Sequence, residues 1–186
     1  KLDGEIVLKP ARQMDPAQAI VISEAPEIEY VSRGAHKLAG ALDILGDTAP
    51  TISDTVCMDA GASTGGFTEV LLRAGARQVF AVDVGYGQLA WKLQSDPRVV
   101  VMDRTNVRTM KDGDLDPKPQ IVVGDMSFIS LTLVIPALVA VATDDADFLL
   151  MVKPQFEIGK ERLGHGGVVR NPNHHVETVE NVALCA

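Results

Sequence analysis

Short apolar runs alternate along most of this chain with segments whose apolar residues recur at helical spacing. The apolar runs predict strands at residues 56–58, 78–83, 98–102, 120–125 and 147–153. The segments before, between and after them, with the capping residues at their ends, predict helices at residues 33–45, 67–75, 131–142 and from 171 onward, and a turn followed by a helix at residues 85–93. Strands that alternate with helices are typical of an α/β fold with a Rossmann-like, doubly wound and mostly parallel sheet.

Local signals add expectations about helix ends and about the core. Polar residues before the predicted helices are expected to cap the first turns: Ser32, Ser127, Ser130 and Asn171. Gly46 is expected to end the first helix. Core positions are expected for the aromatic residues Phe67, Trp91 and Phe128, although Phe67 could also contact a cofactor.

Polar residues occupy the carboxyl end of every predicted strand, as Asp59, Asp83, Asp103, Asp125 and Lys153. Parallel strands point the same way, so these side chains are expected at one edge of the sheet. Ligands of open α/β sheets bind outside the carboxyl ends of the strands. The sequence therefore predicts a ligand site at this edge.

A glycine-rich turn joins the first of these strands to the helix that follows it. Its sequence is Asp59-x-Gly61-x-Ser63-x-Gly65-Gly66-Phe67. A strand, a glycine turn and a helix in this order place backbone N–H groups at the mouth of the sheet. The pattern differs from G-x-G-x-x-G, and the carboxylate of Asp59 would repel a dinucleotide pyrophosphate. The carboxylate of Asp59 suits a cationic group such as an amino-acid ammonium. Ser63 and the glycines let the backbone approach a cofactor.

Two further acidic strand ends complete a candidate cofactor site. Asp83 lies about twenty residues beyond the turn, the spacing at which a carboxylate grips the two hydroxyls of a ribose. A nucleoside with a zwitterionic amino-acid end fits both Asp59 and Asp83, and S-adenosylmethionine is such a molecule. In this interpretation Asp103 contacts the edge of the adenine. The predicted cofactor site consists of Asp59, Gly61, Ser63, Gly65, Gly66, Phe67, Asp83 and Asp103.

Composition and charge narrow the classes of protein to which this chain could belong. With 186 residues, the chain is expected to form one domain with a fragment of another. The two cysteines indicate no disulfide framework and favour a cytoplasmic protein, and no apolar run reaches the ~18 residues of a membrane helix. The net charge of −8 argues against nucleic-acid binding by the whole surface, but leaves local basic clusters such as Arg33, His36 and Lys37. No Cys/His cluster has metal-ligand spacing, so no metal is expected.

Five motifs in order resemble the TlyA family, whose members are often labelled haemolysin A. They are VSRGAHKL at residues 31–38, DAGASTGGFTE at 59–69, DVGYGQLAW at 83–91, DMSFISL at 125–131 and VKPQFE at 152–157. The resemblance implies a ribosomal RNA 2'-O-methyltransferase with an FtsJ-like catalytic domain, which uses S-adenosylmethionine. It also implies that residues 1–22 are the remnant of a small RNA-binding domain of the ribosomal-protein-S-four kind. Residues 23–30 are then a linker and residues 31–186 a methyltransferase domain whose last strands lie beyond Ala186.

The same resemblance implies a Lys-Asp-Lys-Glu catalytic tetrad. By motif, Lys37, Asp125 and Lys153 match its first three members, and the glutamate is expected beyond Ala186, since Glu157 and Glu177 stand in other motifs. These residue types suit transfer of a methyl group to a ribose hydroxyl. One lysine accepts the hydroxyl proton, Asp125 orients it, and the other lysine stabilises the charge that develops on oxygen. Lys153 is assigned as the base.

Three other functions compete with this interpretation. The run from Gly61 to Gly65 also matches G-x-S-x-G, so Ser63 is a candidate nucleophile of an α/β-hydrolase-like esterase. Asp125 and then His165, His174 or His175 would complete its triad in the required order. A membrane-lysing haemolysin would need an amphipathic basic helix or a barrel pattern, which this sequence lacks. A dinucleotide oxidoreductase is disfavoured by the glycine turn.

Overall fold

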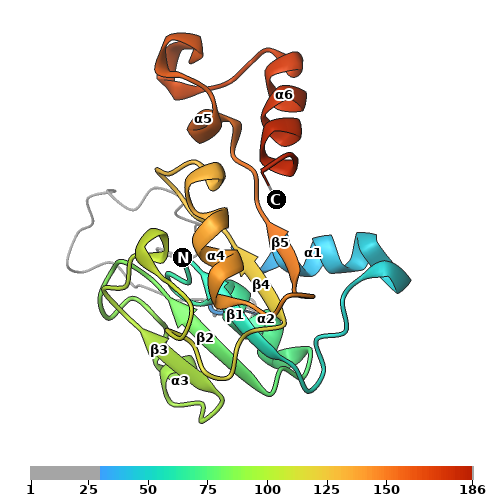
Figure 1. Ribbon diagram of the computed structural model, residues 1–186, viewed down its shortest axis with the longest axis vertical. Helices are drawn as coiled ribbons and strands as arrows, with labels where there is room; N and C mark the ends of the chain where they lie inside the picture. Colours follow the sequence, from blue (N-terminus) through green and yellow to red (C-terminus); the bar gives the residue numbers. More distant parts are fainter. Residues whose placement is uncertain (1–29, 186) are drawn as a thin grey trace, which may run out of the picture.

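Within residues 30–185, five parallel strands form one sheet in the order β3-β2-β1-β4-β5 (Figure 1). The strands are β1 (Val56–Ala60), β2 (Gln78–Val82), β3 (Val99–Met102), β4 (Ile121–Gly124) and β5 (Asp147–Leu150). The structure is a computed structural model that describes residues 30–185, apart from the side chains of Lys160 and His165. The predictions for residues 1–22 and for the linker up to residue 29 lie outside the described residues.

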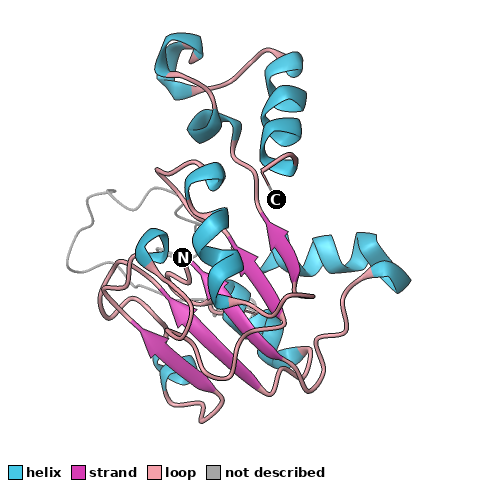
Figure 2. Ribbon diagram, viewed as in Figure 1, coloured by secondary structure: helices cyan, strands magenta, loops and turns pink. Residues whose placement is uncertain are grey.

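Helical segments lie before, between and after the strands, and they cover both faces of the sheet (Figure 2). They are α1 (Ala35–Leu45), α2 (Gly66–Arg73), α3 (Trp91–Gln94), α4 (Ile135–Val141), α5 (Pro154–Glu157) and α6 (Pro172–Ala183). Short 3-10 turns lie at Gly46–Thr48, Val107–Thr109, Leu131–Leu133, Lys160–Arg162 and His165–Gly167. This arrangement confirms the predicted doubly wound α/β fold.

Alternating strand residues build a separate core on each face of the sheet. Met58 of β1 and Val122 of β4 belong to the core beneath α4, whereas Cys57 and Val123 belong to the core beneath α1, α2 and α3. Both faces of the central strands are therefore apolar, which is why the strands appear in the sequence as continuous apolar runs. Burial on both faces fixes the register, since a slip of one residue would exchange the two cores.

The last part of the chain extends beyond the carboxyl ends of the strands. Figure 1 shows α5 and α6 side by side past the end of β5. Asn171 accepts a hydrogen bond from the backbone N–H of Asn173 and caps α6, as predicted. Val182 of α6 reaches the core beneath α4, so this extension is anchored to the rest of the domain.

Several local predictions are wrong. Ser32 does not cap α1, because Gly34 occupies the N-cap position and no side chain bonds to it. The fifth strand ends at Leu150 and not at Lys153. The side chains of Trp91 and Phe128 are 78% and 91% exposed, so neither belongs to the core, whereas Phe67 is buried as predicted.

Candidate active site

The register of the sheet brings the polar strand ends to one edge. The last residues of the five strands stand in one row of partners: Ala60, Val82, Met102, Gly124 and Leu150. Asp83, Asp103 and Asp125 each follow one of these residues directly, and Lys153 comes shortly after β5. The predicted gathering of these side chains at the carboxyl edge is therefore confirmed.

Asp59 is the last residue but one of β1 and is buried. Its Oδ2 accepts a hydrogen bond from the Thr68 backbone N–H at 2.8 Å and another from the Thr68 hydroxyl at 2.7 Å. Burial, with a smaller contribution from the nearby charges of Asp83 and Asp125, raises the pKa of Asp59 to about 7 against the opposing effect of the Thr68 hydrogen bonds. The carboxyl therefore connects the central strand to the first turn of α2.

The raised pKa of Asp59 predicts a pH-dependent stability. The folded protein binds the proton of Asp59 more tightly than the unfolded chain does. The contribution of this group to the free energy of unfolding is therefore fully present below pH 3.8 and is lost as the pH rises through about 7. We expect Asp59→Asn, which still offers Thr68 an acceptor oxygen, to show a weaker decline than the unmutated protein. Denaturant unfolding at several pH values between about 4 and 8 measures the difference. Parallel curves for the two proteins would contradict the assignment.

Asp83 organises the two loops on either side of it. Its Oδ2 accepts the Ser63 backbone N–H at 2.8 Å, and its Oδ1 accepts the Gly85 backbone N–H at 2.7 Å. Ser63 itself has a positive φ of 48°, and its hydroxyl lies 3.5 Å from Oε1 of Gln88. The carboxylate thus holds the glycine-rich turn against the loop after β2, while each oxygen keeps capacity for a further donor.

The three predicted catalytic residues meet in the structure. Asp125 lies between two lysines, with its Oδ2 2.7 Å from Nζ of Lys37 and its Oδ1 2.7 Å from Nζ of Lys153. The lysines differ in environment, because the side chain of Lys153 is 12% exposed and that of Lys37 is 47% exposed. Burial raises the pKa of Asp125, but the two lysines outweigh it and hold this pKa below its ordinary value.

Two adjoining hollows open at this edge of the sheet. The larger has a volume of about 490 Å³ and is lined by Val82, Asp83, Gln88, Asn106 and Phe128, among others. The smaller has a volume of about 340 Å³ and is lined by Lys37, Asp59, Gly66, Phe67 and Lys153, among others. Gly61, Ser63, Asp125 and Ser127 line both hollows. A ligand that fills the larger hollow would therefore reach the Lys–Asp–Lys group.

Two residues of the predicted cofactor site line neither hollow. The carboxylate of Asp103 accepts the backbone N–H of Gly87 at 2.8 Å, which stabilises the loop before α3. Gly65 is buried by protein, since a Cβ there would lie 2.3 Å from a methyl carbon of Leu93. With its φ of +97°, Gly65 has a packing reason and a backbone reason to lack a side chain.

Ser127 and Phe128 are residues of this site that the sequence interpretation missed. Ser127 was expected to cap a helix, but its hydroxyl accepts a hydrogen bond of 2.7 Å from Nζ of Lys153, and Ser130 alone caps the following turn. Phe128 has a positive φ of 66°, a conformation in which a bulky residue is strained. Both residues lie within three positions of Asp125 in the sequence, and this closeness to an acidic strand end is the signal that could have indicated a role in the site.

The alternative serine triad is not assembled with His174 or His175, the two candidate histidines whose side chains the structure describes. Among the residues that the structure describes, no histidine hydrogen-bonds to Ser63, and the Nε2 of His175 instead contacts the carbonyl oxygen of Val169 at 2.9 Å. The glutamates in other motifs also have other partners. Glu157 accepts hydrogen bonds from the hydroxyl of Ser130 and the backbone N–H of Leu131, and Glu177 pairs with Arg162.

Comparison with known proteins places these features in a family. The family model of FtsJ-like methyltransferases matches residues 30–185. The 16S/23S rRNA (cytidine-2'-O)-methyltransferase TlyA of Mycobacterium tuberculosis is 50% identical over 183 residues, which are 98% of this chain and 67% of that protein. The chain therefore spans about two thirds of the length of this relative.

Two solved structures with the same fold carry a hemolysin name, whereas the relative from Mycobacterium tuberculosis carries a methyltransferase name. A protein from Lactococcus lactis with the name "putative hemolysin" is 43% identical, with a TM-score of 0.81 over 86% of this chain and 76% of that chain. A protein from Streptococcus thermophilus with the same name is 42% identical, with a TM-score of 0.80 over 87% of this chain and 57% of that chain. Within residues 30–185, no helix combines the length and the apolar character needed to span a bilayer.

Proposed function

This chain belongs to the FtsJ-like methyltransferase family, as a relative of the TlyA ribosomal RNA methyltransferases, and we propose that it methylates a ribose 2'-hydroxyl of ribosomal RNA with S-adenosylmethionine. The observation that carries the proposal is the bridge from Asp125 to Lys37 and Lys153 at 2.7 Å each, beside the two hollows. A substrate that belongs to the ribosome implies a cytoplasmic protein.

The acidic residues around the hollows fit the cofactor. S-adenosylmethionine supplies an electrophilic methyl group on a sulfonium, and its amino-acid end is a zwitterion. Asp83 lines the larger hollow with unused acceptor capacity for ribose hydroxyls. Asp59 lines the smaller hollow, where a bound ammonium would lower the raised pKa of this carboxyl and favour its ionised form. The apolar side chains of Val82, Val107 and Ile129 in the larger hollow suit the flat face of an adenine.

The Lys–Asp–Lys group performs the proton transfer. A ribose hydroxyl is a weak nucleophile, so it must be aligned with the methyl group and must lose its proton during the transfer. Lys153, the more buried lysine, accepts this proton in its deprotonated form, while Asp125 and the Ser127 hydroxyl hold its Nζ in place. Lys37 lies on the opposite side of the carboxylate and stabilises negative charge on the attacking oxygen.

The exposed ring of Phe128 provides a surface for the base of the target nucleotide. It lines the larger hollow next to Ser127, and it packs only on Phe156, at 5.3 Å between ring centroids, among the aromatic rings of the described residues. Proteins that bind unpaired RNA nucleotides commonly stack the splayed-out base on an aromatic side chain, and the exposed ring of Phe128 offers such a surface.

We expect Phe128→Ala to raise the KM for ribosomal RNA by about tenfold, because stacking of one base contributes about 1–3 kcal/mol. Steady-state methyl transfer at varied RNA concentration measures this change. Trp91→Ala is the matched control, since Trp91 is also an exposed aromatic residue but lines neither hollow. Equal KM values for Phe128→Ala and the control would contradict the stacking role.

Isothermal titration calorimetry tests the cofactor directly. The intact protein is titrated with S-adenosylmethionine and, separately, with NAD. The proposal predicts binding of S-adenosylmethionine and none of NAD, because the carboxylate of Asp59 lies at the turn where a pyrophosphate would bind. Binding of NAD alone would contradict the proposal.

A further inference from the structure

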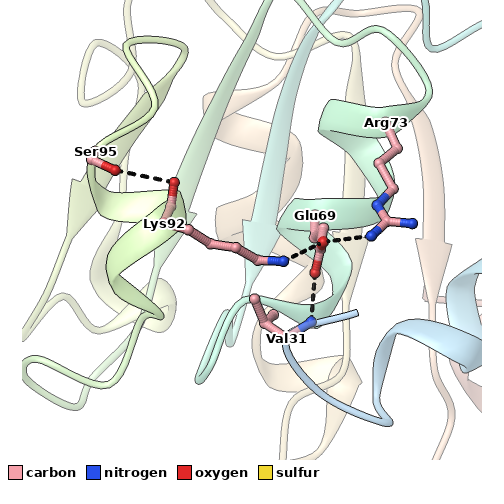
Figure 3. A network of polar contacts seen from close by, with 5 residues as sticks. All are labelled: Val31, Glu69, Arg73, Lys92 and Ser95. Carbon is pink, nitrogen blue, oxygen red and sulfur yellow. Dashed lines mark hydrogen bonds and ion pairs between the residues drawn. The ribbon is translucent and has the colours of Figure 1, made fainter. Parts of the chain in front are cut away.

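A buried glutamate behind the active site joins three segments of the chain. The side chain of Glu69, on α2, is only 6% exposed. Its Oε2 accepts the backbone N–H of Val31 at 2.6 Å, and its Oε1 accepts Nζ of Lys92 at 2.8 Å and a guanidinium nitrogen of Arg73 at 2.9 Å (Figure 3). Glu69 contacts neither hollow, so it is not part of the site described above.

The three hydrogen bonds to Glu69 differ in how readily water could replace the carboxylate. Burial raises the pKa of Glu69, but the hydrogen bonds from Lys92, Val31 and Arg73 outweigh it and leave this pKa below its ordinary value. The side chains of Lys92 and Arg73 are about half-exposed, so water can replace the carboxylate for both. The bond to Val31 is different, because it fixes backbone that leads directly into α1.

The segment before α1 lies along one face of α2. Tyr30 packs its ring on the guanidinium of Arg73, 4.4 Å from the ring centroid, and Val31 bonds to Glu69. Further along, a Cβ on Gly66 would lie 2.5 Å from the hydroxyl oxygen of Ser32. Positions 66, 69 and 73 recur at helical spacing, so one stripe of α2 receives the whole segment.

This segment determines where α1 begins. No side chain caps α1, and the backbone N–H of Ala35 lies so close to α2 that a Cβ on Gly66 would be 2.8 Å from it. Lys37 follows in the first turn of α1, where the backbone N–H of Lys37 bonds to the carbonyl of Gly34 at 3.0 Å. A shift of this segment along α2 would therefore move Lys37 relative to Asp125.

We propose that Glu69 is a positioning residue that holds Lys37 against Asp125 by anchoring the backbone of Val31 to α2. This inference rests on the proposed methyl transfer, in which Lys37 stabilises charge on the attacking oxygen. The neighbouring Thr68 bonds to Asp59, so the same turn of α2 supports both the cofactor side and the lysine side of the site. Glu69 acts through Lys37 and touches no reacting atom.

Three substitutions of Glu69 separate anchoring from charge. Glu69→Gln removes the charge but keeps an oxygen that accepts from Val31, whereas Glu69→Asp keeps the charge but withdraws the carboxylate by one methylene. Glu69→Ala removes both. We expect kcat to fall about tenfold or more in Glu69→Ala and Glu69→Asp, and less than about threefold in Glu69→Gln, because small displacements of a catalytic group reduce the rate steeply. The dissociation constant for S-adenosylmethionine should change by less than about twofold in all three, since Asp59 and Asp83 stay in place.

Asp96→Ala is the matched control. Asp96 also accepts a backbone N–H and forms an ion pair, both with Arg98, but it lies on the chain after α3 and lines neither hollow. We expect this variant to keep kcat within about twofold of the unmutated protein. A retained kcat in Glu69→Asp with a lost kcat in Glu69→Gln would overturn the inference, because charge and not anchoring would then matter. That comparison decides the question even if Glu69→Ala fails to fold.

Amide hydrogen exchange provides a readout that does not depend on activity. Exchange of the Val31 amide should be faster in Glu69→Asp than in the unmutated protein, and should stay slow in Glu69→Gln. If the unmutated protein transfers no methyl group, the proposed function fails while the exchange result still shows whether Glu69 anchors Val31. If methyl transfer is normal in the unmutated protein and equal in Glu69→Asp, the positioning role alone is overturned.

Discussion

Replacing Lys153 with alanine in the intact protein is expected to lower methyl transfer at saturating S-adenosylmethionine by about 10²-fold or more. The loss follows from the position of the side chain, since its Nζ lies 2.7 Å from both Asp125 and Ser127 and faces the smaller hollow. The hydroxyl proton would have no acceptor. Single-turnover kinetics with labelled cofactor measures the chemical step without the contribution of product release.

Cofactor affinity should be retained in Lys153→Ala, because Asp59 and Asp83 supply the contacts that bind S-adenosylmethionine in this account. Lys118→Ala is the matched control, since Lys118 also pairs with an aspartate, Asp112, and lines neither hollow. Normal turnover in Lys153→Ala would remove this lysine from the mechanism. A parallel loss of cofactor binding would assign it a binding role instead.

Asp83→Ala is expected to weaken the binding of S-adenosylmethionine by about 10²-fold or more, because hydrogen bonds to a charged group contribute about 1.5–3 kcal/mol each. In this account the carboxylate binds two ribose hydroxyls, and it also holds Ser63 and Gly85 by their backbone N–H groups. The substitution therefore removes direct contacts and loosens both loops of the larger hollow. Isothermal titration calorimetry measures the affinity.

Asp114→Ala is the control for Asp83→Ala. Asp114 also accepts a backbone N–H, from Lys111 at 2.9 Å, but it lies away from both hollows. The control should bind S-adenosylmethionine as the unmutated protein does. Unchanged affinity in Asp83→Ala would show that the ribose binds elsewhere, and the assignment of the larger hollow would then be wrong.

The fold could be predicted because this sheet is buried on both faces. Central strands need apolar side chains in both directions, so they appear as mostly apolar runs. The run at residues 78–83 contains β2, and the run at residues 56–58 gives the first three residues of β1, whose fourth residue is the buried Asp59. The polar residues at the strand ends could be predicted for a related reason. A carboxylate such as Asp83 or Asp125 is stable where an apolar strand opens to solvent at the edge of the sheet.

Other features could not be predicted because they depend on contacts between distant segments. Ser32 has the residue type of a cap, but Gly66 brings the chain so close to α2 that Gly34 takes the cap position. Phe128 is a residue type typical of a core, yet it has a positive φ and an exposed ring that lines the same hollow as Asp125. Glu69 follows the glycine turn as an ordinary helix residue, and its partner Val31 is 38 residues away in the sequence.

Nucleoside mass spectrometry of ribosomal RNA tests the central claim most directly. Ribosomal RNA is incubated with the intact protein and with S-adenosylmethionine that carries a deuterated methyl group, and is then digested to nucleosides. We expect a deuterated methyl group on the ribose of a nucleoside, and about 10²-fold less or lower still when Lys153→Ala replaces the unmutated protein. A deuterated methyl group on a base, or no labelled nucleoside from a protein that binds the cofactor, would contradict the claim.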